Sequence, residues 1–329
     1  MKKIIIINII VIFFIFFALE TTLRLFNISY TQDIDNRLFY KTTDITLNNK
    51  NIVTKVFGKK VITDNNGFRV PYFDYKYKYN KSILVLGDSV SFGIGVEEEK
   101  SFIGITRNTE SKNIYNTSVM GLNITDYNKL LKIYSKKFSD ISNVLIFICL
   151  NDTFYKQGVI DESEVNKITN EKEKDIVDSL VKNKFLIKTD IFLRNKSALF
   201  VFIKSLVTNP NKRGFFYSFD DYSDDEKMRI FKENIKKIIE TSKSNNLNTK
   251  YVVLPFAYQI DDLKCDNKYL KPQKKIKQIF SELGESVEDL TDDFCKHNKP
   301  NNLFFDSVHL TNQGNKFVFE LLKKRNILN

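Results

Sequence analysis

The chain of 329 residues contains no tryptophan and only two histidines, three cysteines and three methionines. The spacing of Cys149, Cys265 and Cys295 fits no zinc motif, so we expect no zinc site. Cys149 lies inside an apolar run and is expected to be a core residue. Cys265 and Cys295 can pair if their domain lies outside the cytoplasm, and the sequence leaves this question open.

Basic residues outnumber acidic ones and give a formal net charge of +11, but no basic stripe is interleaved with aromatic residues. The lysines occur in scattered pairs, which is typical of a solvated surface, so we expect no nucleic-acid partner. Hydrophobic residues make up 42% and charged residues 28% of the chain, which indicates a globular rather than a disordered protein.

One long apolar run stands at the N-terminus. Lys2 and Lys3 precede a run from Ile4 to Leu19 that only Asn8 interrupts. As a helix this run would be about 24 Å long, and residues 21–26 can extend it towards the roughly 30 Å of a bilayer core. The two lysines place the N-terminus in the cytoplasm and the rest of the chain outside, in a periplasm or at the cell surface.

We therefore predict a transmembrane anchor at residues 1–26, with membrane contact through residues 4–26. A cleaved signal peptide is the competing interpretation. The small-x-small cleavage pattern is missing where the run ends, at Phe17 to Glu20, and this favours an uncleaved anchor.

Short apolar segments alternate with helical patterns in the rest of the chain. They are Ser82 to Leu86, Asn113 to Tyr115, Asn143 to Leu150, Lys250 to Leu254 and Val287 to Leu290. Strands that are apolar on both faces belong to a sheet covered on both sides, and the alternation indicates parallel βαβ units. We predict an α/β fold: a three-layer, flavodoxin-like sandwich with about five parallel strands, plus one N-terminal transmembrane helix.

The domain layout follows from these segments. Residues 27–80 are predicted to be a connector that packs on the main domain, which extends over residues 81–329. A helical insert is expected at about 153–222. Ser223 and Glu226 form a potential capping box for a helix that runs to about Ser242.

Ser89 lies just past the first apolar strand, in the sequence Gly87-Asp88-Ser89. This places it at the carboxyl edge of a parallel sheet, where open α/β proteins have their sites. Of the two histidines, His309 has a carboxylate three residues before it, Asp306. Asp306 can fix the tautomer of His309, and His309 can then accept the proton of a serine nucleophile.

Attack of a serine on an acyl carbon also requires donors for the oxyanion that forms. Gly121 and Asn151 follow the second and third strands, so they are expected at the same edge of the sheet as Ser89. The backbone N–H groups of Ser89 and Gly121 and the side-chain amide of Asn151 are the three candidate donors.

These segments together resemble four sequence blocks of the SGNH/GDSL hydrolases, in the order of that family. The blocks are Gly87-Asp88-Ser89, Ser118-Val119-Met120-Gly121, Asn151-Asp152 and Asp306-Ser307-Val308-His309. Thr63 to Arg69 is also similar to a stretch in membrane-anchored bacterial members, which often carry one N-terminal anchor. One position departs from the family pattern, because Cys149 stands where the third block usually has glycine.

The resemblance implies a serine esterase in which Ser89 is the nucleophile, and in which Asp306 and His309 complete the catalytic triad. It implies no metal and no organic cofactor. An acyl ester is the expected substrate, with O-acyl groups of surface glycans as one class. The sequence leaves two alternatives open: an O-acyltransferase that modifies a surface polysaccharide, and a non-catalytic glycan-binding or assembly protein on the same fold.

Overall fold

The computed structural model describes residues 2–26, 28–153 and 184–328. The chain divides into two compact units. The helical unit comprises Met1–Asp35, Lys55–Gly58 and Asp161–Pro210, and the sheet unit comprises Asn36–Thr54, Lys59–Ile160 and Asn211–Asn329. All five residues that the sequence suggests for catalysis belong to the sheet unit.

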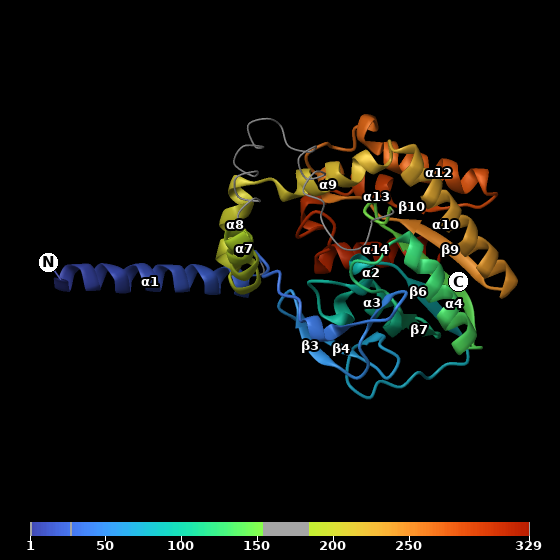
Figure 1. Ribbon diagram of the computed structural model, residues 1–329, viewed down its shortest axis with the longest axis horizontal. Coiled ribbons are helices and arrows are strands. Elements are labelled where there is room, and N and C mark those ends of the chain that lie inside the picture. Colours follow the sequence, from blue (N-terminus) through green and yellow to red (C-terminus); the bar gives the residue numbers. More distant parts are fainter. Residues whose placement is uncertain (1, 27, 154–183, 329) are drawn as a thin grey trace. The chain divides into compact units, whose positions relative to one another are not determined.

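Five parallel strands form the centre of the sheet unit (Figure 1). They are β6 (Ser82–Leu86), β7 (Asn113–Asn116), β8 (Ile141–Ile148), β9 (Asn248–Val253) and β10 (Glu288–Asp289). Their order in the sheet is β10-β9-β8-β6-β7, and every pair is parallel. This is the flavodoxin-like order, in which the chain changes direction across the sheet after its first two strands. The predicted sheet is confirmed.

Helices cover both faces of this sheet (Figure 1). They are α2 (Ser89–Phe92), α3 (Phe102–Thr109), α4 (Ile124–Lys137), α10 (Asp225–Ser244), α12 (Lys271–Glu282), α13 (Thr291–Cys295) and α14 (Asn312–Lys324). Successive side chains of β6 point to opposite faces. Leu84 and Leu86 pack with α4, α10 and α12, while Ile83 and Val85 pack with α3, α13 and α14. The predicted three-layer architecture is therefore confirmed.

Short elements complete the sheet unit. They are β1 (Phe39–Lys41), β2 (Thr46–Asn48), β4 (Lys59–Thr63), β5 (Arg69–Val70), α9 (Pro210–Asp221), α11 (Ala257–Ile260) and the 3-10 helices Asn36–Leu38, Glu98–Lys100, Asn267–Leu270 and Pro300–Asn302. β3 (Val53–Val56) crosses the boundary between the units. The segment predicted as a connector thus contains strands, and its Phe68 is fully buried against Tyr115 and Tyr134.

The start of α10 differs from the expectation. The side chain that caps this helix belongs to Asp224 and not to Ser223, and its carboxylate accepts hydrogen bonds from the backbone N–H groups of Glu226 and Lys227. Aspartate and serine are both good capping residues, and the carboxylate also interacts favourably with the positive end of the helix dipole. The helix extends to Ser244.

The helical unit contains α1 (Lys2–Leu25), α7 (Lys184–Lys196) and α8 (Ala198–Val207). Within the described residues, α1 is the one helix long and apolar enough to cross a membrane, a test that an N-terminal signal sequence also passes. The insert predicted at 153–222 falls partly on residues 154–183, which lie outside the described residues. Its described remainder contains α7, α8 and α9.

Cys265 and Cys295 form a disulfide, with 6.0 Å between their Cα atoms, while Cys149 is a buried free cysteine. The disulfide closes a loop with a sequence separation of 30 residues, which contains α12, β10 and most of α13. A cross-link of this length reduces the conformational freedom of the unfolded chain.

We expect the Cys265→Ser/Cys295→Ser double variant to have a free energy of unfolding lower by about 3–4 kcal/mol, because the unfolded chain is no longer constrained. Urea denaturation of the oxidised protein measures this difference. A reducing agent should destabilise the wild type by a similar amount and leave the double variant unchanged. Equal stability of the oxidised wild type and the double variant would contradict the prediction.

Candidate active site

The turn from β6 into α2 places Ser89 at the carboxyl edge of the sheet. All five residues of β6 are buried, and Gly87 and Asp88 connect the strand to the helix that begins with Ser89. A β-carbon at position 87 would overlap the hydroxyl of Ser91, so only glycine fits at this close approach.

Asp88 caps α2 and is in contact with two groups of the site. Its Oδ1 accepts a hydrogen bond of 2.9 Å from the backbone N–H of Val90. Its Oδ2 lies 3.2 Å from Ser89 Oγ and 3.2 Å from Asn151 Nδ2. The sequence analysis gave Asp88 no role, although aspartate directly before a helix is a recognisable capping signal.

His309 and Asp306 occupy one loop that folds back on itself. Oδ1 of Asp306 accepts hydrogen bonds from the backbone N–H groups of Val308 and His309, at 3.0 and 2.8 Å. Its Oδ2 lies 2.6 Å from Nδ1 of His309. The loop is closed by a bridge between Phe304 and Leu310. The local sequence therefore determines the distance between carboxylate and imidazole.

Nε2 of His309 lies 2.9 Å from Oγ of Ser89, so the structure brings together the three residues expected to form a triad. Because Asp306 accepts a hydrogen bond from the Nδ1–H group, the neutral imidazole has its acceptor nitrogen at Nε2. Ser89 has one hydroxyl proton, and His309 is nearer to Oγ than Asp88 is. The short distance thus favours donation from Ser89 to His309.

The electrostatic environment favours a charged pair of His309 and Asp306. Burial opposes the charge on both side chains, but their mutual attraction and hydrogen bond outweigh it. The pKa of His309 is therefore raised above 6.5, and the pKa of Asp306 is lowered below 3.8, where the backbone N–H groups also contribute. An imidazolium formed at this position would be stabilised by Asp306.

The candidate oxyanion donors lie at the same edge of the sheet. Ser89 is the first residue of α2, where backbone N–H groups have no partner within the helix. Asn151 follows β8 and donates one amide hydrogen to Asp88, and an amide nitrogen carries two hydrogens. Gly121 lies in an exposed turn after β7 with a φ of 78°, and a β-carbon at this position would meet open space.

Cys149 is buried beneath this edge, at the position where the resemblance predicts glycine. Burial, and then the carboxyls of Asp88 and Asp152, raise the pKa of its thiol well above 9.0. A thiol of this kind is a poor nucleophile. Burial and Asp88 also raise the pKa of Asp152 well above 3.8, and Asp152 accepts a 2.8 Å hydrogen bond from the backbone N–H of Cys149. Asp152 is thus a structural support for the turn that carries Asn151.

Phe305 supports His309 from the side. Its ring stacks on the imidazole with 5.7 Å between the centroids and 19° between the planes. The same ring packs against Gly95, where a β-carbon would overlap it. The position of the loop after α2, which contains Gly95, therefore fixes the Phe305 ring that stacks on the imidazole.

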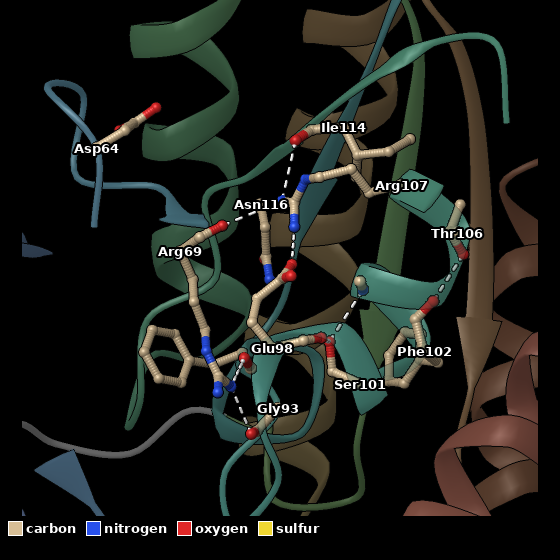
Figure 2. A network of polar contacts seen from close by, with 12 residues as sticks. Asp64, Arg69, Gly93, Glu98, Ser101, Phe102, Thr106, Arg107, Ile114 and Asn116 are labelled. Atoms are coloured by element: carbon tan, nitrogen blue, oxygen red, sulfur yellow. Dashed lines mark hydrogen bonds and ion pairs between the residues drawn. The ribbon is translucent and has the colours of Figure 1, made fainter. Parts of the chain in front are cut away.

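A buried arginine network holds that loop (Figure 2). Nη1 of Arg69 donates to the carbonyls of Phe92 and Gly93 at 2.8 and 2.5 Å, and Nη2 donates to the carbonyl of Val96 at 2.7 Å. The carbonyl of Phe92 ends the helix that begins with Ser89 and the other two follow it, so none of the three has a partner within the helix. Burial lowers the pKa of Arg69 to about 10, so the guanidinium remains charged near neutral pH.

Arg107 of α3 completes the network. It forms an ion pair with Glu98, and both side chains are almost fully buried (Figure 2). Its Nη2 also donates to the carbonyls of Arg69 and Ile114, at 3.0 and 3.2 Å. β5, α3 and the loop after α2 are thereby joined in the core of the sheet unit.

No protein-family model and no curated protein matches the sequence. Solved structures of G-D-S-L lipolytic hydrolases are among those similar to this chain. A member of the lipolytic protein G-D-S-L family from Veillonella parvula is 14% identical with a TM-score of 0.40, over 74% of this chain and 97% of that one.

Two further solved structures are similar over the same share of the chain. The lipase/acylhydrolase from Enterococcus faecalis is 13% identical with a TM-score of 0.43, over 74% of this chain and 94% of that one. The acetyl xylan esterase AlAXEase is 15% identical with a TM-score of 0.43, over 74% and 98%. Because these TM-scores lie below 0.5, the functional conclusion rests on the geometry of the site.

We expect the imidazole of His309 to titrate above pH 6.5, and the Asp306→Asn variant to move its titration to lower pH. Asp306 stabilises the protonated ring, so its removal favours the neutral form. NMR of isotope-labelled histidine measures both titrations, and the His297→Gln variant assigns the signal because the chain has two histidines. An unchanged titration in Asp306→Asn would show that the two side chains do not interact.

We expect Arg69→Met to lower the free energy of unfolding by about 3–5 kcal/mol, because the buried carbonyls of Phe92, Gly93 and Val96 lose their charged donor. Arg229→Met is the matched control. Arg229 is paired but 56% exposed, so its loss should destabilise the protein far less than the loss of Arg69. Urea denaturation compares the two variants, and equal losses would contradict a structural role for the buried network.

Proposed function

We propose that this chain is a serine esterase that acts through an acyl-serine intermediate. Two contacts carry the proposal. Ser89 Oγ lies 2.9 Å from His309 Nε2, and His309 Nδ1 lies 2.6 Å from Asp306 Oδ2. A serine, a base that can accept its proton and a carboxylate that orients the base are what nucleophilic acyl transfer requires.

In the proposed mechanism, His309 accepts the proton of Ser89 as the oxygen attacks the acyl carbon. Asp306 stabilises the imidazolium. The N–H groups of Ser89 and Gly121 and the amide of Asn151 donate hydrogen bonds to the oxyanion. The imidazolium then protonates the leaving alcohol. Water, activated by His309, releases the acyl group and restores the serine.

We propose further that the enzyme acts outside the cytoplasm. The apolar α1 begins with two lysines, which favours a cytoplasmic N-terminus with the remainder of the chain on the other side. The disulfide between Cys265 and Cys295 supports this location, because disulfides persist in oxidising compartments. An enzyme anchored there would meet O-acyl groups of cell-surface glycans, which we propose as its substrate class.

We expect the detergent-solubilised full-length protein to hydrolyse p-nitrophenyl acetate and to react with a fluorophosphonate probe. Ser89→Ala should abolish the labelling and reduce turnover by on the order of 10³-fold or more, because the nucleophile is lost. Ser281→Ala removes an exposed serine of α12 and should match the wild type. The ratio of acetate to butyrate hydrolysis measures the size of the acyl pocket.

A folded wild type that neither hydrolyses esters nor reacts with the probe would contradict the esterase proposal. Labelling at Ser89 without ester hydrolysis would support Ser89 as the nucleophile. It would also indicate that the acyl group passes to an acceptor other than water. Addition of acetylated and free sugars would then show whether the acyl group is transferred to a hydroxyl.

A further inference from the structure

The helical unit carries an exposed apolar stripe on α8. Ile203, Leu206 and Val207 are 47, 70 and 77% exposed. Residues three and four apart lie on the same side of a helix, so these side chains form one continuous strip. Phe192 of α7 is 61% exposed as well. An apolar strip on a helix requires a partner that is itself apolar.

Hydrogen bonds join the start of α8 to the end of α1. The carboxylate of Glu20 accepts hydrogen bonds from Ser197 Oγ, Ala198 N and Leu199 N, at 2.9, 2.9 and 2.8 Å. Glu20 therefore caps a helix from another part of the chain, and its negative charge faces the positive end of that helix. Arg24 adds a second link through a 2.7 Å hydrogen bond to the carbonyl of Lys196.

This link determines the depth of α8 relative to α1. Glu20 lies about 24 Å along the helix axis from Ile4, which is close to the far boundary of a bilayer core that α1 would span. α8 runs across the end of α1 and does not continue its direction (Figure 1). A helix in this orientation would lie in the plane of the membrane surface.

Three charged groups of α7 and α8 are paired with one another. Asp190 lies 2.9 Å from Nε of Arg194 and 2.5 Å from Nζ of Lys204. Arg194 also donates to the side chain of Gln32 at 2.8 Å. Polar groups that already have partners cost less to transfer out of bulk water than unpaired ones. The paired charges and the exposed apolar strip together suit a lipid environment.

We propose that α8 is an interfacial membrane helix, and that its strip of Ile203, Leu206 and Val207 lies in the acyl boundary of the bilayer that α1 spans. The proposal rests on the anchor described under the proposed function and goes beyond it, because it assigns a second membrane contact. Glu20 has a positioning role, since it joins the helix that spans the bilayer to the helix that lies on it.

The test uses the full-length protein in vesicles of phosphatidylethanolamine and phosphatidylglycerol. A polarity-sensitive fluorophore is attached to Leu206→Cys, and to Ser205→Cys as the matched control on the opposite side of α8. Ile10→Cys in the middle of α1 reports on the anchor. Cys149 is buried and the other two cysteines are joined, so labelling is confined to the introduced thiol.

We expect blue-shifted emission at position 206, and a loss of emission with brominated lipids comparable to that at position 10. Position 205 should show neither. Equal, water-like emission at 205 and 206 with quenching at 10 would overturn the proposal while the anchor stands. Blue-shifted emission at 206 without lipid quenching would also overturn it, because a second protein chain would then cover the strip.

Absence of quenching at position 10 would show that α1 does not span the bilayer, and both the anchor and the interfacial helix would then be wrong. Ester hydrolysis in the same vesicles is measured separately, so failure of the catalytic proposal is distinguishable from failure of this one. Glu20→Ala should reduce the quenching at 206 and leave position 10 unchanged. Glu20→Gln, which keeps an acceptor oxygen, should restore part of it. Unchanged quenching in Glu20→Ala would contradict the positioning role of Glu20.

Discussion

The turn between β6 and α2 is the constraint on which the candidate site depends. Gly87 lets the chain pass so close to Ser91 that no β-carbon fits, and Asp88 then starts the helix by capping it. Ser89 is consequently held at the end of a fully buried strand, with little freedom to move. Catalysis requires a nucleophile fixed to within a fraction of an ångström, so the rigidity of this turn suits the role proposed for Ser89.

Three carboxyl groups surround the site, and their environments give them different roles. Asp306 faces an imidazole and two backbone N–H groups, all of which favour its charged form. Asp152 is buried next to Asp88, and this favours its neutral form. Asp88 connects Ser89, Val90 and Asn151, so it orients both the nucleophile and a candidate oxyanion donor. The same chemical group thus serves as orienter of the base, structural support and helix cap.

The strands, and the contact between Asp306 and His309, could be predicted because their signals are local. Short apolar runs predict all five strands of the sheet to within two residues at every end. Asp306 and His309 are three residues apart, so a single turn brings them into contact. The carboxyl ends of parallel strands meet at one edge of a sheet, and this predicts that Ser89 and Asn151 lie at the same edge. The cap of α10 was missed because serine and aspartate carry the same signal at adjacent positions.

The supporting residues could not be predicted, since their partners lie far away in the sequence. Arg69 contacts carbonyls 23 to 27 residues further along the chain, and Glu20 caps a helix 177 to 179 residues away. Sequence patterns show Arg69 as one charge in a polar stretch and Glu20 as an acid out of place in an apolar helix. Arg69 donates to buried carbonyls, and Glu20 caps the start of α8. A charge outside bulk water is retained when specific hydrogen bonds of this kind stabilise it. A charge that contradicts its local pattern, as Glu20 does, is therefore a sign of a long-range contact, whereas the polar stretch around Arg69 gives no such sign. In this chain the contacts of these two residues hold the start of α8 and the loop after α2.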